Sequence, residues 1–152
     1  MQVEVDQSGK LGDTRVPTVL AFSNASSYAI LIPATVKRVC LQELRRQGQT
    51  GTTLYLRLFA VGLFLLLKDH MQNFTQVTID VEYPGHNDKI KAYLLALFRR
   101  AGLPVEKDTF RFDRIHRGSK KPSAHDKAYY TFQGKMKPDK VITLEELLSE
   151  AK

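Results

Sequence analysis

Apolar and polar residues alternate along the first segment of the chain. Val3 and Val5 are separated by polar residues, which predicts a short strand that ends at Asp6. The segments 16–24 and 27–33 have the same apolar and β-branched character, and a polar turn separates them. We therefore expect the chain to begin with a meander of three strands.

Helical spacing begins after Pro33. Apolar residues recur there every three or four positions, which predicts a helix with Lys37 on its polar side. The expected apolar face consists of Val36, Val39, Cys40 and Leu44. A second helix is expected over 54–71, and its apolar run 58–67 would span only ~15 Å, about half of a bilayer's hydrocarbon core. We interpret this helix as part of the core, with an extension into a dimer interface as an alternative.

Strand and helix patterns alternate in the rest of the chain. Strands are expected over 75–85 and 109–116, with an intervening helix that begins near Asn87. The apolar stripe of that helix consists of Ile90, Leu94, Leu97 and Phe98. Pro122 is expected to open the next helix, and Thr143 with Glu146 forms a capping box for the last one.

This order predicts one α/β domain, residues 1–152, with a mixed five-stranded sheet flanked by helices. Its core would cover about residues 1–135, and residues 136–152 would form a C-terminal helical addition.

Composition narrows the class of protein. The single cysteine, Cys40, excludes an intramolecular disulfide and a cysteine-based metal cluster. The lone cysteine fits a reducing cytosol, so a cytoplasmic location is predicted. The N-terminus has no basic region followed by an apolar stretch, so no secretory signal is expected. Because the longest apolar run is too short to span a bilayer, no membrane partner is expected. The net charge of +7 favours a polyanionic partner, most often nucleic acid.

Acidic residues occur where three predicted elements end or begin. Asp6 ends the first strand, Asp80 and Glu82 share a face at the end of the fourth, and His125-Asp126 lies at the start of the helix after the fifth. Sites in open α/β sheets gather outside the carboxyl ends of strands, and neighbouring carboxylates repel unless a cation lies between them. Each residue also has a purely local explanation, because Asp6 could be a turn residue and Glu82 a solvated one. Asp126 could complete a capping box with Ser123.

The segments VEVDQSG, VTIDVEY and PSAHDKA, in this order, resemble the ribonuclease H-like nuclease superfamily, and the last is closest to the Holliday-junction resolvase branch. The resemblance covers roughly residues 1 to 135. It implies a two-metal site for Mg²⁺ or Mn²⁺ held by Asp6, by Glu82 or Asp80, and by Asp126, with Asp6 bridging the ions. The resolvase pattern has another acidic residue or His three positions before that last Asp, where this chain has Ser123. His125 is the alternative fourth ligand, or a general base.

Basic residues flank the predicted site. Contacts to substrate phosphates are expected from Lys10, Arg117, Lys120, Lys121 and Lys127. Tyr129, Tyr130 and Phe132 could stack on bases, but packing in the core is the favoured interpretation.

These features predict a divalent-metal-dependent nuclease that acts on structured nucleic acid, with branched DNA as the first substrate and a homodimer as the expected assembly. One alternative is a non-catalytic nucleic-acid-binding protein with the same fold, and another is a scaffold that binds a partner through its apolar helix. Carboxylates that converge within ~5 Å would favour the nuclease, since two-metal sites hold their ions ~3.5–4 Å apart.

Overall fold

The computed structural model describes residues 1–24, 26–114 and 124–152. Within these ranges one sheet contains the strands β1 (Gln2–Ser8), β2 (Thr18–Ser23), β3 (Ser27–Ile32), β4 (Gln76–Asp80), β5 (Phe110–Asp113) and β6 (Lys140–Val141). The helices are α1 (Ala34–Arg46), α2 (Gly51–Leu67), α3 (Asn87–Arg100), α4 (Ala124–Phe132) and α5 (Leu144–Ala151), with short 3₁₀ turns η1 (Met71–Asn73) and η2 (Lys107–Thr109). The prediction of an α/β fold with a mixed sheet is confirmed.

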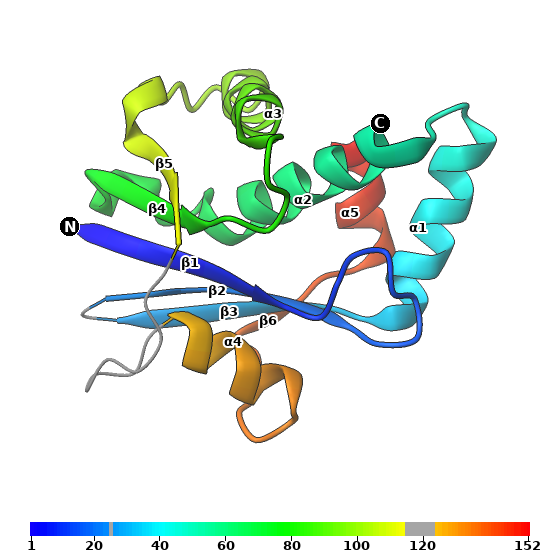
Figure 1. Cartoon of the computed structure of the whole chain (residues 1–152), viewed down its shortest axis with the longest axis horizontal. Coiled ribbons are helices and arrows are strands. Elements are labelled where there is room, and N and C mark those ends of the chain that lie inside the picture. The colour runs from blue at the N-terminus through cyan, green and yellow to red at the C-terminus, as the bar shows by residue number, and fades with distance from the viewer. Residues whose placement is uncertain (25, 115–123) are drawn as a thin grey trace.

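The sheet has the strand order β5-β4-β1-β2-β3-β6. β1, β2 and β3 pair antiparallel, as the predicted meander requires, while β4 pairs parallel with β1 and β5 parallel with β4. The carboxyl ends of β1, β4 and β5 therefore lie at the same edge of the sheet (Figure 1).

The predicted count of five strands is wrong by one within the described residues. β6 belongs to the segment expected to be helical, and it pairs parallel with β3 through Ile30 and Leu31. A strand of two residues is too short to show the alternation from which strands are predicted.

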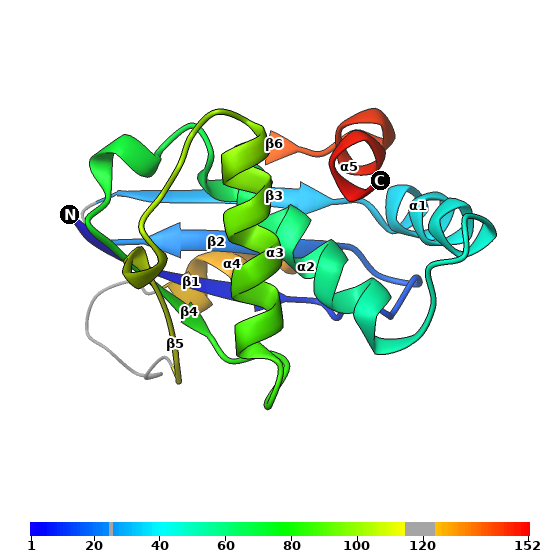
Figure 2. The ribbon, with the colours of Figure 1, turned by 90° about the horizontal axis from the view of Figure 1, so that it is seen from above.

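The helices cover the two faces of the sheet unequally. Figure 1 shows α2, α3 and α5 on one face and α4 on the other, and Figure 2 shows α3 lying outside α2. α2 packs on β2, β3, α3 and α5, whereas α4 packs on β1, β2 and β3. The larger layer contains the main core, and the smaller one is a thin layer of Val19, Ala21, Ala29 and Ala128.

The apolar helix predicted as core is α2. Every residue from Leu58 to Leu67 is buried, which confirms that interpretation and leaves no apolar face in this run for a partner or a dimer interface. Among the described residues, no helix is long and apolar enough to cross a membrane.

The predicted orientation of α1 is wrong at two positions. Val39, assigned to the core, is 44% exposed, and Lys37, assigned to the polar side, is completely buried. The Lys37 ammonium donates to the carbonyl oxygens of Lys10 and Asp13 and to Thr18 Oγ1, at 3.0, 2.7 and 3.0 Å. These three oxygens belong to the segment between β1 and the start of β2, so α1 is oriented by this polar contact as well as by its apolar residues.

Several boundaries near the candidate site differ from those predicted. β1 continues past Asp6 to Ser8, and β4 stops at Asp80, so that Glu82 lies beyond the strand. Gly102, with φ of +75°, ends α3 as expected, and the capping box of α5 is confirmed. Pro122, Ser123 and the proposed phosphate-binding residues Arg117, Lys120 and Lys121 lie outside the described residues.

Gly9 allows the chain to turn immediately after β1. Its φ is +84°, and a Cβ atom there would lie 2.2 Å from the carbonyl oxygen of Pro17. Gly9→Ala should therefore lower the free energy of unfolding by at least about 2 kcal/mol in urea denaturation. Gly12→Ala is the matched control, because its φ is not positive and its Cβ would meet Tyr55 at an ordinary 3.5 Å. Equal losses in the two variants would contradict this account of Gly9.

Candidate metal centre

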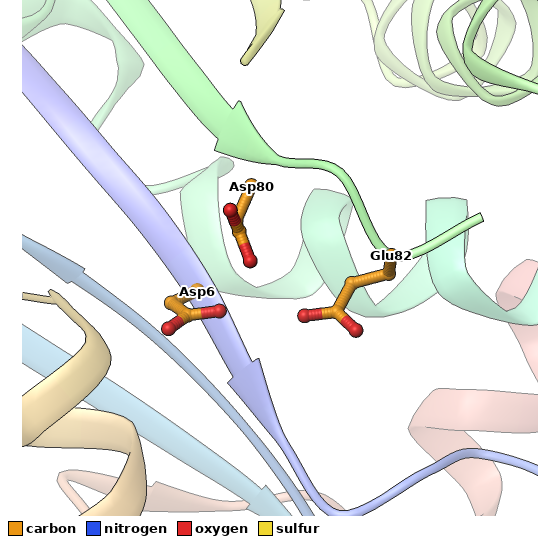
Figure 3. A group of neighbouring side chains, drawn as sticks. All are labelled: Asp6, Asp80 and Glu82. Atoms are coloured by element: carbon orange, nitrogen blue, oxygen red, sulfur yellow. The ribbon is translucent and has the colours of Figure 1, made fainter. Parts of the chain in front are cut away.

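Parallel pairing of β1 and β4 brings two aspartates together. Val5 is paired with Ile79, so that the following residues, Asp6 and Asp80, are neighbours across the two strands and point to the same face. Glu82 follows two residues later, and its carboxylate points toward the other two (Figure 3). Ligand oxygens of Asp6, Asp80 and Glu82 lie within 4.8 Å of one another.

The three carboxylates fit a small divalent cation. Mg²⁺ forms bonds of about 2.0–2.1 Å to oxygen, so two ligands on opposite sides of it lie about 4.2 Å apart. A separation of at most 4.8 Å therefore needs only a small side-chain rotation to bring the group onto one ion. Hard carboxylate oxygens are also the ligands that Mg²⁺ and Mn²⁺ prefer. The sequence left open whether Asp80 or Glu82 belongs to this site, and the structure brings both residues to it.

Asp6 is the buried member of the group, with 5% of its surface exposed. Burial raises the pKa of its carboxyl group, and the negative charge of Asp80 acts in the same direction. Hydrogen bonds from the Gln7 backbone N–H and from His125 oppose this increase. A divalent cation would stabilise the ionised form of Asp6 far more than these two contacts do.

His125 and the Gln7 backbone N–H contact different oxygens of the Asp6 carboxylate. The His125 Nδ1 lies 2.8 Å from Asp6 Oδ2, and the Gln7 N–H donates to Asp6 Oδ1 at 2.8 Å. His125 reaches β1 because α4 packs closely against small residues of the sheet. Ala21 and Ala29 face Ala128 of the helix in the thin second layer of the core.

Two more predicted site residues, Asp126 and Lys127, lie on α4. Asp126 follows His125 and is half-buried, but it is not a member of the three-carboxylate group. The Lys127 side chain is only 10% exposed, and its Nζ lies 3.4 Å from Asp139 Oδ2. Lys127 therefore forms an ion pair within the protein. The proposed ligand set consists of Asp6, Asp80 and Glu82, and Asp126 is not part of it.

An open groove of about 770 Å³ adjoins the carboxylates, with Glu82 in its wall. Lys10, predicted to contact phosphate, lines it and is exposed. Arg15 lies there too, held by two hydrogen bonds to Asp13 of 3.0 and 3.1 Å. The other residues in the wall are Gln7, Gly12, Asp13, Thr14, Tyr55 and Tyr83. We refer to this surface as the Lys10 groove.

The aromatic residues of the Lys10 groove were not predicted. Burial and the charge of Glu82 raise the pKa of Tyr83 to about 12, so Tyr83 stays a neutral phenol. Its position directly after Glu82 was a signal that could have identified it. Tyr55 had no such signal, because it lies in a helix whose apolar composition predicts only core packing.

Comparisons with known proteins do not extend this description. No protein-family model, no curated protein and no solved structure matches the chain. The resemblance to ribonuclease H-like nucleases therefore remains a prediction from the motifs, and the function has to be argued from the residues of the site.

Metal titration distinguishes the candidate ligands. Asp80→Asn and Glu82→Gln should each weaken Mn²⁺ binding by at least about tenfold in isothermal titration calorimetry, because each removes a charged oxygen ligand. Asp126→Asn should leave the affinity unchanged, since Asp126 is not in the three-carboxylate group. A loss with Asp126→Asn equal to that with Glu82→Gln would restore Asp126 as a ligand, as the resemblance implies.

Proposed function

We propose that this chain is a divalent-metal-dependent nuclease with a ribonuclease H-like fold, and that Asp6, Asp80 and Glu82 hold its Mg²⁺ or Mn²⁺. The observation that carries the proposal is the convergence of these carboxylates within 4.8 Å at the carboxyl ends of two adjacent parallel strands. The element order and the mixed sheet are compatible with that fold.

Each residue of the candidate site would have a defined role. Asp6, Asp80 and Glu82 would supply the oxygen ligands, and the ions would activate a water molecule and stabilise the leaving oxyanion of a phosphodiester. His125 and the Gln7 N–H would keep the Asp6 carboxylate in one orientation, since each contacts a different oxygen. Because Nδ1 of His125 is engaged by Asp6, a proton could be exchanged with the substrate through Nε2.

The substrate would be a nucleic acid. A net charge of +7 and the exposed Lys10, which lines the same groove as Glu82, suit a polyanion that lies along the Lys10 groove. Branched DNA is the first candidate, because the segment 122–128 resembles the resolvase helix. Symmetrical cutting of two strands would then require a homodimer.

One observation favours the alternative function, a non-catalytic nucleic-acid-binding protein. His125 Nδ1 lies 2.8 Å from Asp6 Oδ2, and this contact would satisfy one carboxylate oxygen without a metal. In that case the acidic group would be a structural feature, and the basic surface alone would bind nucleic acid.

A cleavage assay separates the two functions. Labelled four-way DNA junction, linear duplex DNA and RNA–DNA hybrid are incubated with the protein in Mn²⁺ or in EDTA. The nuclease proposal predicts products only with Mn²⁺, with the junction cut fastest. Substrates that are bound but remain intact in Mn²⁺ would support the binding protein. Failure to bind any of the three would contradict both functions.

A further inference from the structure

Two tyrosines of α4 are exposed, although the sequence favoured core packing for them. Tyr129 and Tyr130 have 43% and 41% of their surfaces exposed. α4 has nine residues, and its buried positions are Ala124, Ala128 and Thr131. Phe132 supplies the expected aromatic contact with the thin core layer, and the two tyrosines are not part of that layer.

The exposed rings continue directly from the candidate metal centre. The ring centroids of His125 and Tyr129 are 6.1 Å apart with an interplanar angle of 17°, and those of Tyr129 and Tyr130 are 6.1 Å apart at 33°. His125 contacts Asp6. A row of three rings therefore leads from the buried carboxylate to the surface, and we call it the α4 ring row.

The outer end of the α4 ring row carries a positive charge. Lys135 Nζ lies 5.8 Å from the centroid of the Tyr130 ring, within the range of a cation–π contact. An exposed aromatic face beside a lysine suits a ligand that is planar, apolar on its faces and negatively charged along its backbone. Proteins that bind single-stranded nucleic acid combine these same two features.

We propose that Tyr129 and Tyr130 form a stacking surface for unpaired nucleobases of the substrate, next to the position at which the strand is cut. The inference rests on the proposed function for its choice of nucleic acid as the ligand. Bases in a duplex are stacked on each other and expose little of their faces, so the surface selects single-stranded or locally unpaired strands. Base pairs at the crossover of branched DNA lie at the ends of duplex arms and open at a lower cost than pairs inside a duplex, which would give the site a reason to prefer a junction over a linear duplex.

The test measures binding separately from cleavage. Fluorescence anisotropy in EDTA gives the affinity of the full chain for labelled 20-nucleotide DNA, RNA of the same sequence, and the corresponding duplex DNA. Tyr129→Ala and Tyr130→Ala should each weaken single-strand binding roughly tenfold, because one stacking partner is lost. Tyr129→Phe should bind as the wild type does, since the ring remains. Duplex affinity should change less than twofold in all variants, and equal losses with DNA and RNA identify the shared base as the ligand.

The control is Leu103→Ala. Leu103 is another exposed apolar residue, 45% exposed. It lies three residues after the end of α3, a helix on the opposite face of the sheet from α4 (Figure 1). Leu103→Ala should leave the affinity for every nucleic acid unchanged. Circular dichroism of each variant checks that α4 is still folded.

The outcomes separate this inference from the proposed nuclease. Single-strand affinity that is unchanged in both alanine variants would overturn the stacking surface, while Mn²⁺-dependent cleavage by the same proteins would leave the nuclease in place. If the wild-type protein cuts nothing in Mn²⁺ and Tyr129→Ala binds single strands more weakly than the wild type, the nuclease would be refuted and the stacking surface supported. A wild type that binds neither single strand would overturn the stacking surface.

Discussion

Asp6→Asn should reduce Mn²⁺-dependent cleavage by on the order of a thousandfold or more, which is the largest effect expected from any single substitution. The amide has nearly the same size as the carboxylate but no negative charge, and Asp6 is the buried member of the three-carboxylate group. Single-turnover cleavage of the junction at saturating protein measures the effect on the chemical step. Mn²⁺ titration of the same variant measures the loss of the ion.

Glu4→Gln is the matched control for this substitution. Glu4 lies two residues earlier on β1, is exposed, and is not a member of the three-carboxylate group. Removal of its charge should leave the cleavage rate within about twofold. Similar losses in both variants would mean that the acidic strand as a whole, and not a metal site at Asp6, determines the rate.

Protein stability distinguishes a lost site from a misfolded protein. Because the pKa of Asp6 is raised in the folded state, its ionised form opposes folding at neutral pH. Asp6→Asn should therefore be at least as stable as the wild type toward urea at pH 7. A variant that is inactive and as stable as the wild type would locate the defect in the site, whereas an unstable one would show that Asp6 supports the fold.

Lys37→Met should lower the free energy of unfolding by about 3 kcal/mol, the second large effect. The substitution preserves the length and apolar stem of a completely buried side chain but removes its ammonium group. Three oxygens that accept from Lys37 would lose a donor, at about 1–3 kcal/mol each where no water replaces it, partly offset by the removal of a buried charge. Urea denaturation at pH 7 measures the difference.

Arg38→Met provides the comparison for Lys37. Arg38 is the next residue of α1, is exposed, and makes one bond of 3.3 Å to the carbonyl oxygen of Thr14. Its loss should change the free energy of unfolding by less than about 0.5 kcal/mol. Lys10 and Asp13 line the Lys10 groove, so Lys37→Met should also weaken nucleic-acid binding there. Equal stability losses in the two variants would contradict a special role for the buried lysine.

The pH dependence of this effect has a definite sign. Burial lowers the pKa of Lys37 from 10.5 to about 8. Between these two values the unfolded chain binds a proton that the folded chain does not, so the contribution of Lys37 to stability rises with pH across this window. The difference in unfolding free energy between wild type and Lys37→Met should therefore be larger at pH 10 than at pH 7. A constant difference would mean that Lys37 keeps its proton throughout.

Local pattern was sufficient for most of the secondary structure. Val3 and Val5 are buried as their alternation predicts, and the stripe of α3 from Ile90 to Phe98 faces the core. The capping box of Thr143 and Glu146 is present as well. These features depend on residues a few positions apart, and periodicity reports such relations directly.

Packing overrode the pattern at particular residues. Lys37 is buried because oxygens of a distant segment surround its ammonium group, and no helical spacing reveals them. Tyr129 and Tyr130 are exposed because α4 is short and only its alanine side meets the sheet. A nine-residue helix contains too few turns for its apolar residues to define a face.

The candidate site also depends partly on local sequence and partly on tertiary structure. The sequence alone identified Asp6, Asp80, Glu82, His125 and Asp126 as candidate ligands or catalytic residues, from their types and their places at the ends or starts of predicted elements. Their convergence depends on the parallel register of Val5 with Ile79 and on the packing of α4, which bring together residues as many as 119 positions apart. Pairing over such a distance is determined by the burial of whole strand and helix faces, so only the tertiary structure could decide that His125 contacts Asp6.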